Sequence, residues 1–236
     1  MKKIFACVLL VIGFSSAVYS QNKSIRLNAY GAYAFDDNID NGYSYSTVGY
    51  FSGKLKGGFL WGAGLEFRMH EYYGIELLYQ RLDTHAPIDY LPYNSISNDI
   101  KSANVKVGMN YIMLGGTRSL HAGGGKAEPY GGFMLGVAII NAENDDLQTP
   151  TSNSATKFAW GLRLGTNIWA SEKVGIKLQT QLLSVPQGAG GGLYFGTGGA
   201  GVGVTTYSSM LQFILGGGLT FKLGGHAQTT QTQTTQ

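Results

Sequence analysis

The stretch F-L-W-G-A-G-L-E-F-R-M at residues 59–69 decides how this chain folds. Its odd-numbered positions are all apolar, whereas the even-numbered positions from Gly62 to Arg68 carry glycine or charge. Successive side chains of a β-strand point to opposite faces, so this period of two predicts a strand with one apolar and one polar face. A helix would repeat its apolar positions every three to four residues, and this stretch does not.

The same alternation occurs eight times along the chain. The stretches are 25–35, 59–69, 73–80, 103–113, 130–139, 158–168, 174–182 and 207–222. After residue 20 no run of 18 apolar residues follows, so we expect no membrane-spanning helix. A closed barrel is then the remaining way to cross a bilayer, because open sheet edges leave backbone groups unpaired in lipid. The sequence predicts an all-β fold, an eight-stranded antiparallel up-and-down transmembrane β-barrel.

The segments between these stretches alternate in length, as they do in bacterial outer-membrane barrels. We expect long outer loops at 36–58, 83–99, 141–155 and 184–206. Short inner turns are expected at 70–72 and 170–173, together with a longer, glycine-rich one at 115–128.

Aromatic residues support a membrane barrel over a soluble β-sandwich, which would alternate but has no reason to sort its rings into two belts. We expect an outer belt of Tyr33, Phe35, Phe59, Trp61, Tyr79, Phe158, Trp160 and Tyr207. The inner belt is expected to hold Phe67, Tyr73, Tyr111, Trp169 and Phe221.

The first twenty residues have the plan of a secretory signal peptide. Lys2 and Lys3 precede an apolar run from Ile4 to Phe14, and small residues lead to a cleavage site after Ser20. Cys7, the only cysteine, lies in this run, so we expect a mature chain without disulfides or thiolate metal sites. We predict a signal peptide at 1–20, the barrel at 21–223 and a disordered Thr/Gln-rich tail at 224–236.

Composition and charge narrow the function. Charged residues make up 13% of the chain against about 25% in average proteins, which is unusual for a soluble enzyme. The net charge of +3 includes Lys2 and Lys3, and without them 15 basic residues face 14 acidic ones. We therefore expect no nucleic-acid partner, since such partners need a concentrated basic face.

The chain resembles small Gram-negative outer-membrane barrels. The resemblance covers nearly all of residues 22–223 and includes the barrel-ending stretch 212–223 and the segment Glu128-Pro129-Tyr130-Gly131-Gly132. These features are similar to the OmpA transmembrane domain, OmpX, OmpW and the related barrel domain common in Bacteroidetes. The resemblance implies an outer-membrane protein that contacts lipid and, we expect, acts as a monomer.

Charges on the polar faces are predicted to point into the barrel. They are Arg26, Glu66, Arg68, Glu76, Lys106, Arg163 and Lys177. One interpretation is an ion-pair network that fills an interior only just wide enough for side chains. The other is a porin-like channel for ions or small solutes, favoured by the inward glycines and by the excess of positive groups.

Aromatic residues in the expected outer loops favour a surface interaction, because rings are enriched at contact surfaces. The contact candidates are Tyr43, Tyr45, Tyr50, Phe51, Tyr194 and Phe195. We expect a non-enzymatic structural or surface-binding role at the cell surface, with adhesion or an extracellular partner, and no cofactor, metal or catalytic residue.

A hydrolase at the outer rim ranks last among the functions. It would need carboxylates and a serine beside a histidine, and the candidates are Asp83, His85, Asp89, Ser97, Glu143, Asp145, Asp146 and Ser184. A divalent cation bridging the acidic loops is a further hypothesis. The alternative to both hypotheses is that these loops have no catalytic or metal-binding role and are polar because water surrounds them.

Overall fold

The computed structural model describes residues 24–42, 48–92, 101–120, 126–144, 151–186 and 210–223. Within these ranges the chain forms ten strands: β1 (Ser24–Ala34), β2 (Asp37–Gly42), β3 (Val48–Leu55), β4 (Gly58–Arg68), β5 (Tyr73–Pro92), β6 (Lys101–Ser119), β7 (Ala127–Asn144), β8 (Thr151–Trp169), β9 (Val174–Val185) and β10 (Met210–Leu223). No described segment is a helix with the length and apolarity needed to cross a membrane.

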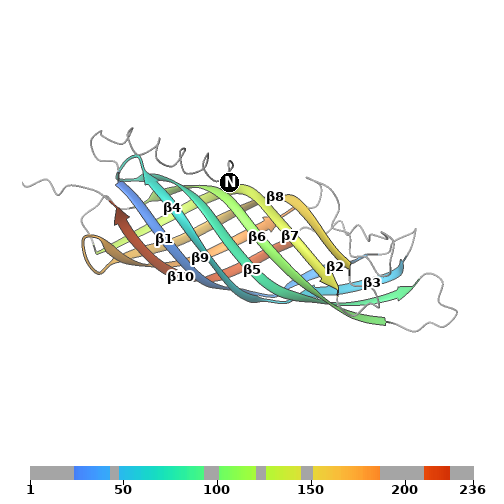
Figure 1. Cartoon of the computed structure of the whole chain (residues 1–236). Coiled ribbons are helices and arrows are strands. Elements are labelled where there is room, and N and C mark those ends of the chain that lie inside the picture. The colour runs from blue at the N-terminus through green and yellow to red at the C-terminus, as the bar shows by residue number, and fades with distance from the viewer. Residues whose placement is uncertain are drawn as a thin grey trace, which may run out of the picture.

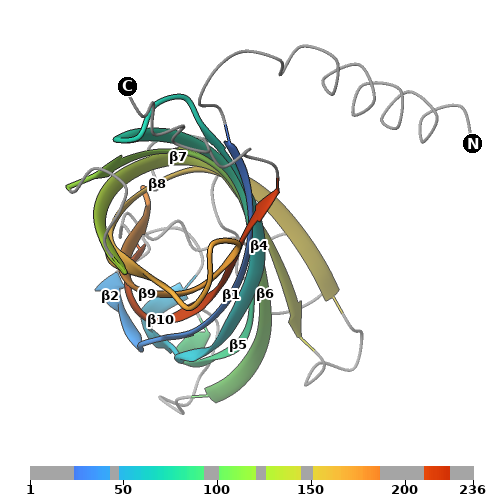
Figure 2. The same cartoon turned by 90° about the vertical axis from the view of Figure 1, so that its left-hand side faces the viewer.

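Eight of these strands close into an antiparallel barrel (Figures 1 and 2). Around the ring they run β1, β4, β5, β6, β7, β8, β9 and β10, and β10 pairs again with β1. The closing register joins Ile25 to Leu223 and Ala34 to Ile214. Closure leaves no open edge along the shared height of the strands, which is the condition for a sheet in lipid. The predicted eight-stranded all-β barrel is confirmed.

The remaining two strands form a hairpin within the segment 36–58, which the sequence predicts as a loop. β2 pairs with β3, and β3 pairs with the outer part of β5, where β4 has not yet begun. Asp36, which precedes β2, contacts the chain at the other end of the hairpin. Its carboxylate accepts a hydrogen bond from the Gly57 amide at 2.7 Å and pairs with Lys54 at 2.9 Å. These two partners hold the pKa of Asp36 below its usual value.

Other strands also extend further than the alternation predicts. β5 continues to Pro92 and β6 begins at Lys101, while β7 and β8 reach Asn144 and Thr151. Most of the predicted loops 83–99 and 141–155 is therefore strand. Similarly, residues 115–119 belong to β6 and pair with β5 and β7. The glycine-rich inner turn predicted at 115–128 is therefore shorter than predicted.

β6 has its two faces reversed relative to the prediction over residues 104–113. Val107, Met109 and Tyr111 are buried inside the barrel, whereas Lys106 is exposed on its outer surface. On the outward face Ile112 and Leu114 are exposed as lipid-facing residues are, and the polar residues Asn104 and Lys106 lie on the same face closer to the outer end. The predictions that Lys106 faces the interior and that Tyr111 belongs to the inner aromatic belt are therefore wrong.

The outer surface at mid-barrel is apolar, as lipid contact requires. Exposed large side chains include Leu27, Phe67, Leu77, Leu114, Leu135, Leu164, Ile176 and Leu219. Toward the outer end, Trp61 and Tyr79 form a ring pair with centroids 6.0 Å apart. Beyond them on β5, Arg81 makes two hydrogen bonds to Asp83, at 2.8 and 2.9 Å. This change from aromatic to charged side chains on the outer surface marks the outer edge of the lipid belt at β4 and β5.

Candidate functional site: the barrel interior

Three groups of side chains fill the interior from the inner end to the outer end. The inner group, beside the short turns, contains Arg26, Glu66, Arg68, Glu128 and Trp169. A central group follows, with Tyr30, Glu76, Tyr130, Arg163 and Lys177. The outer part is an apolar cluster contributed by the barrel strands and the end of β3.

Glu128 holds the inner group together. Arg26 and Arg68 pair with its carboxylate at 3.1 and 3.2 Å, and the Ser119 hydroxyl donates to it at 2.6 Å. The Trp169 indole N–H also donates to Glu128, at 3.2 Å. One carboxylate therefore links β1, β4, β6, β7 and β8 at the inner mouth.

Trp169 lies among cations at this mouth. The Arg26 guanidinium lies 4.9 Å from the centroid of its ring and the Lys222 ammonium 3.8 Å, distances typical of cation–π contacts. Trp169 shares the inward parity of Arg163 and Asn167 along β8, so the prediction that it joins the inner lipid belt is wrong. Its ring instead lies among the charged side chains at the inner end of the interior.

An ion pair between Glu76 and Arg163 forms the middle of the central group, and neither side chain has exposed surface. Asn28 donates to Glu76 at 2.7 Å, and the Tyr30 hydroxyl also donates to it. Lys177 donates to Tyr30 at 3.3 Å. Two charges removed from water need this density of partners, since each buried ion otherwise costs several kcal/mol.

Lys177 connects the central and inner groups. Its ammonium lies 3.7 Å from a Glu66 carboxylate oxygen and 5.0 Å from the centroid of the Tyr130 ring. Glu66 in turn pairs with Arg68 at 3.4 Å. The ionic groups on six of the eight barrel strands thus form one continuous network.

Inward glycines provide the space for this network. A Cβ on Gly64 would lie 2.0 Å from a Glu76 oxygen, and a Cβ on Gly74 would lie 2.9 Å from Glu66. On the opposite side, a Cβ on Gly115 would lie 3.1 Å from the Arg163 guanidinium. Long charged side chains occupy the volume that these glycines leave. The glycine content therefore does not indicate an open lumen.

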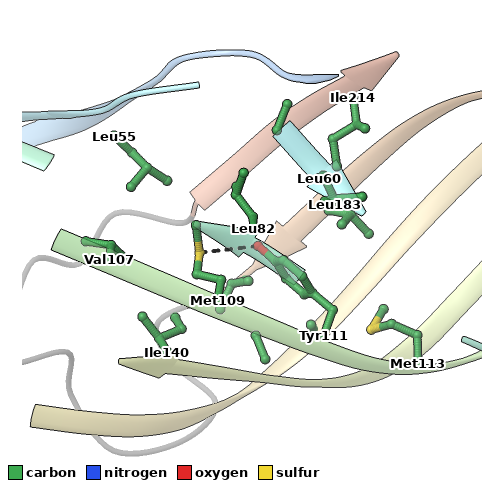
Figure 3. Close-up of a cluster of buried hydrophobic side chains, with 14 of the residues drawn as sticks. Leu55, Leu60, Leu82, Val107, Met109, Tyr111, Met113, Ile140, Leu183 and Ile214 are labelled. Carbon is green, nitrogen blue, oxygen red and sulfur yellow. Dashed lines mark hydrogen bonds between the residues drawn. The ribbon is translucent and has the colours of Figure 1, made fainter. Parts of the chain in front are cut away.

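The outer cluster is apolar, and Figure 3 shows within it the contact of the Tyr111 hydroxyl with the Met109 sulfur. Leu60, Leu82, Met109, Ile140, Leu183 and Ile214 are all buried around it. Tyr111 donates to the Gln212 carbonyl oxygen at 3.2 Å, and its hydroxyl lies 3.4 Å from the Met109 sulfur. Buried apolar side chains therefore make up most of the described outer part of the interior.

The structure buries six of the seven predicted interior charges: Arg26, Glu66, Arg68, Glu76, Arg163 and Lys177. Lys106 lies outside the barrel, as described above. Sequence reasoning missed two buried charges, Glu128 and Lys157. The alternation of side chains along each strand was the available signal, because Glu128 lies on the same strand face as Tyr130 and Lys157 lies on the same face as Arg163.

The predicted outer contact residues fall mostly outside the described part of the chain. Tyr43, Tyr45, Tyr194 and Phe195 lie in undescribed ranges, and so do the predicted signal peptide and tail. Tyr50 and Phe51 are placed only as backbone, on β3 opposite Leu91 and Tyr90 of β5. These surface contacts remain predictions.

Among the described residues the hydrolase candidates do not converge, and Ser97, Asp145 and Asp146 lie outside the described part of the chain. Asp83 is engaged by Arg81, and His85 lies on the exposed face of β5. Ser184 lies on β9, four strands from β5 around the ring and thus on the opposite wall. Among the described residues no three His, Cys, Asp or Glu side chains group as metal ligands do.

Comparison with known proteins identifies the fold. Neisserial surface protein A matches with a TM-score of 0.51 at 16% identity, covering 86% of this chain and 100% of that chain. The outer membrane protein OprG from Pseudomonas aeruginosa matches with a TM-score of 0.50 at 13% identity, covering 86% of this chain and 96% of that one. No family model and no curated protein matches the sequence. The chain has the fold of small outer-membrane β-barrels.

Proposed function

We propose that this protein is a closed outer-membrane barrel that anchors outward-facing loops for contact with a partner or surface. It reaches that membrane through a signal peptide cleaved after Ser20. In this role the barrel is a rigid base, and recognition occurs at the outer end, where Tyr43, Tyr45, Tyr50, Phe51, Tyr194 and Phe195 are the contact candidates.

The observation that carries the proposal is the filled interior. Trp169 lies among Arg26, Glu128 and Lys222 at the inner mouth, the Glu76–Arg163 pair lies in the middle without exposed surface, and the apolar cluster occupies the outer part. A channel needs a continuous water-filled path through the barrel, and each of these groups lies across such a path. Surface interaction is thereby favoured over the porin-like alternative.

A cysteine-free mature chain allows a direct test of orientation and export. We expect Tyr45→Cys to react on intact cells with a maleimide attached to a large, membrane-impermeant polymer. The matched variant Lys126→Cys, beside an inner turn and exposed, is expected to react only after the outer membrane is broken. The wild-type protein should not react even when denatured, because Cys7 leaves with the signal peptide.

Gel migration after labelling gives the readout, since each attached polymer retards the band. Reaction of Lys126→Cys on intact cells would contradict the proposed orientation. Labelling of the denatured wild-type protein would contradict cleavage of the signal peptide.

A further inference from the structure

Two glutamines on opposite walls of the barrel have amide groups that the protein leaves unpaired. Gln80 on β5 has no exposed surface and Gln181 on β9 has 2%. In the described part of the chain, neither the nitrogen nor the oxygen of either amide has a hydrogen-bond partner. Leaving a buried polar group unpaired costs about 1–3 kcal/mol. Buried groups of this kind are commonly satisfied by bound water.

The register places the two glutamines at nearly the same level. From Gln80 the cross-strand partners lead through Tyr111 and Ala138 to Lys157, near the outer end of β8. Gln181 pairs with Arg163, further along β8 toward the inner end. With strands about 4.8 Å apart, a rise of about 3.3 Å per residue and a tilt of about 40°, these paths put Gln80 and Gln181 within about 3 Å in height.

The width of the barrel sets the gap between them. Eight strands with that spacing and tilt enclose a circle about 16 Å across. A glutamine amide reaches about 5 Å from its Cα, so two facing glutamines leave about 6 Å, which is two hydrogen bonds of about 2.9 Å. By this estimate the gap is wide enough for one bridging molecule the size of water.

A neighbouring pair shows what happens when one side chain is longer. Tyr111 and Gln212 also lie four strands apart, on β6 and β10, and their side chains meet directly at 3.2 Å. A tyrosine hydroxyl reaches further from the backbone than a glutamine amide. The tyrosine–glutamine pair therefore closes the barrel width by itself, whereas the glutamine–glutamine pair does not.

We propose that Gln80 and Gln181 bind buried water, which bridges the barrel between the central ionic group and the apolar cluster. Water fits because the unpaired atoms include both donors and acceptors, and a buried water typically makes about three hydrogen bonds to such groups. The nearby amide nitrogens of Gln179 and Gln212 are also unpaired and extend this set of donors. An inorganic anion would satisfy only the nitrogens and would leave both glutamine oxygens unpaired.

The test detects the water in the folded protein. In the barrel refolded in detergent micelles, NMR should show cross-peaks between water and the side-chain NH₂ protons of both Gln80 and Gln181, with opposite signs in the laboratory-frame and rotating-frame experiments, as a long-lived complex gives. Gln181→Leu keeps the approximate volume and removes the hydrogen-bonding groups, so the cross-peak at Gln80 should weaken severalfold. Thr117→Val, which removes a buried hydroxyl bonded to Glu66 and the Gly74 carbonyl near the inner end, serves as the matched control and should leave both cross-peaks in place.

Absence of water cross-peaks at both glutamines in the wild-type protein would overturn the proposal. A bromide ion between the two amides, located by anomalous scattering in crystals grown from bromide, would overturn it in favour of an anion site.

Discussion

Replacing Arg163 with methionine is expected to destabilise the barrel by about 3–5 kcal/mol, because the change leaves Glu76 as a buried charge without its main partner. Methionine retains much of the length of the side chain, so the loss measures the charge more than the volume. Urea unfolding of the protein in phospholipid vesicles, followed by the shift in gel migration between folded and unfolded forms, gives the free energy.

The double variant Arg163→Met and Glu76→Met is the control for this prediction. Removing both charges leaves no uncompensated ion, and well-packed apolar pairs commonly match or exceed the stability of the ion pair that they replace. We expect the double variant to unfold within about 1 kcal/mol of the wild-type protein. If Arg163→Met alone cost less than that, the network would not be an essential part of the interior.

Gly64→Ala is expected to cost about 1–3 kcal/mol, although it adds a single methyl group. Its Cβ would lie 2.0 Å from a Glu76 oxygen. Glu76 has little freedom to move away, because Arg163, Asn28 and Tyr30 all hold its carboxylate. The same unfolding measurement in vesicles checks the loss.

Gly116→Ala provides the matched control on the other face of the sheet. A Cβ there meets nothing within 4 Å, and Gly116 is exposed toward the lipid. Where alanine can adopt the backbone conformation of a glycine without strain, replacing that glycine with alanine stabilises the folded protein by about 0.4–1 kcal/mol, because alanine restricts the unfolded chain. Equal losses from the two substitutions would show that the interior has spare room.

The sequence predicts the fold because lipid and interior impose opposite polarity on alternate residues over most of the barrel. Residues 59–69 illustrate this, since Trp61 and Phe67 face lipid while Glu66 and Arg68 join the ionic network. The same rule fails along residues 104–113 of β6, where the polar Lys106 faces outward and Tyr111 faces inward. In this stretch both faces carry residues of mixed polarity near the outer end, and alternation alone does not say which face meets the lipid.

The interior network is only partly predictable for a related reason. The alternation of side chains along each strand identifies which charges point inward. It also indicates Glu128 and Lys157, which the prediction did not include. It does not reveal which cation meets which carboxylate, because Glu76 and Arg163 are 87 residues apart and meet only once the register is set. The role of Gly64 and Gly115 as space for these side chains also depends on that register.

The central claim is that the barrel is filled from end to end, and planar-bilayer recording tests it most directly. We expect purified, refolded protein, inserted into the bilayer and shown to be folded by its heat-dependent gel migration, to give no discrete conductance steps across the accessible voltages. Reproducible unitary steps from the wild-type protein would contradict the account.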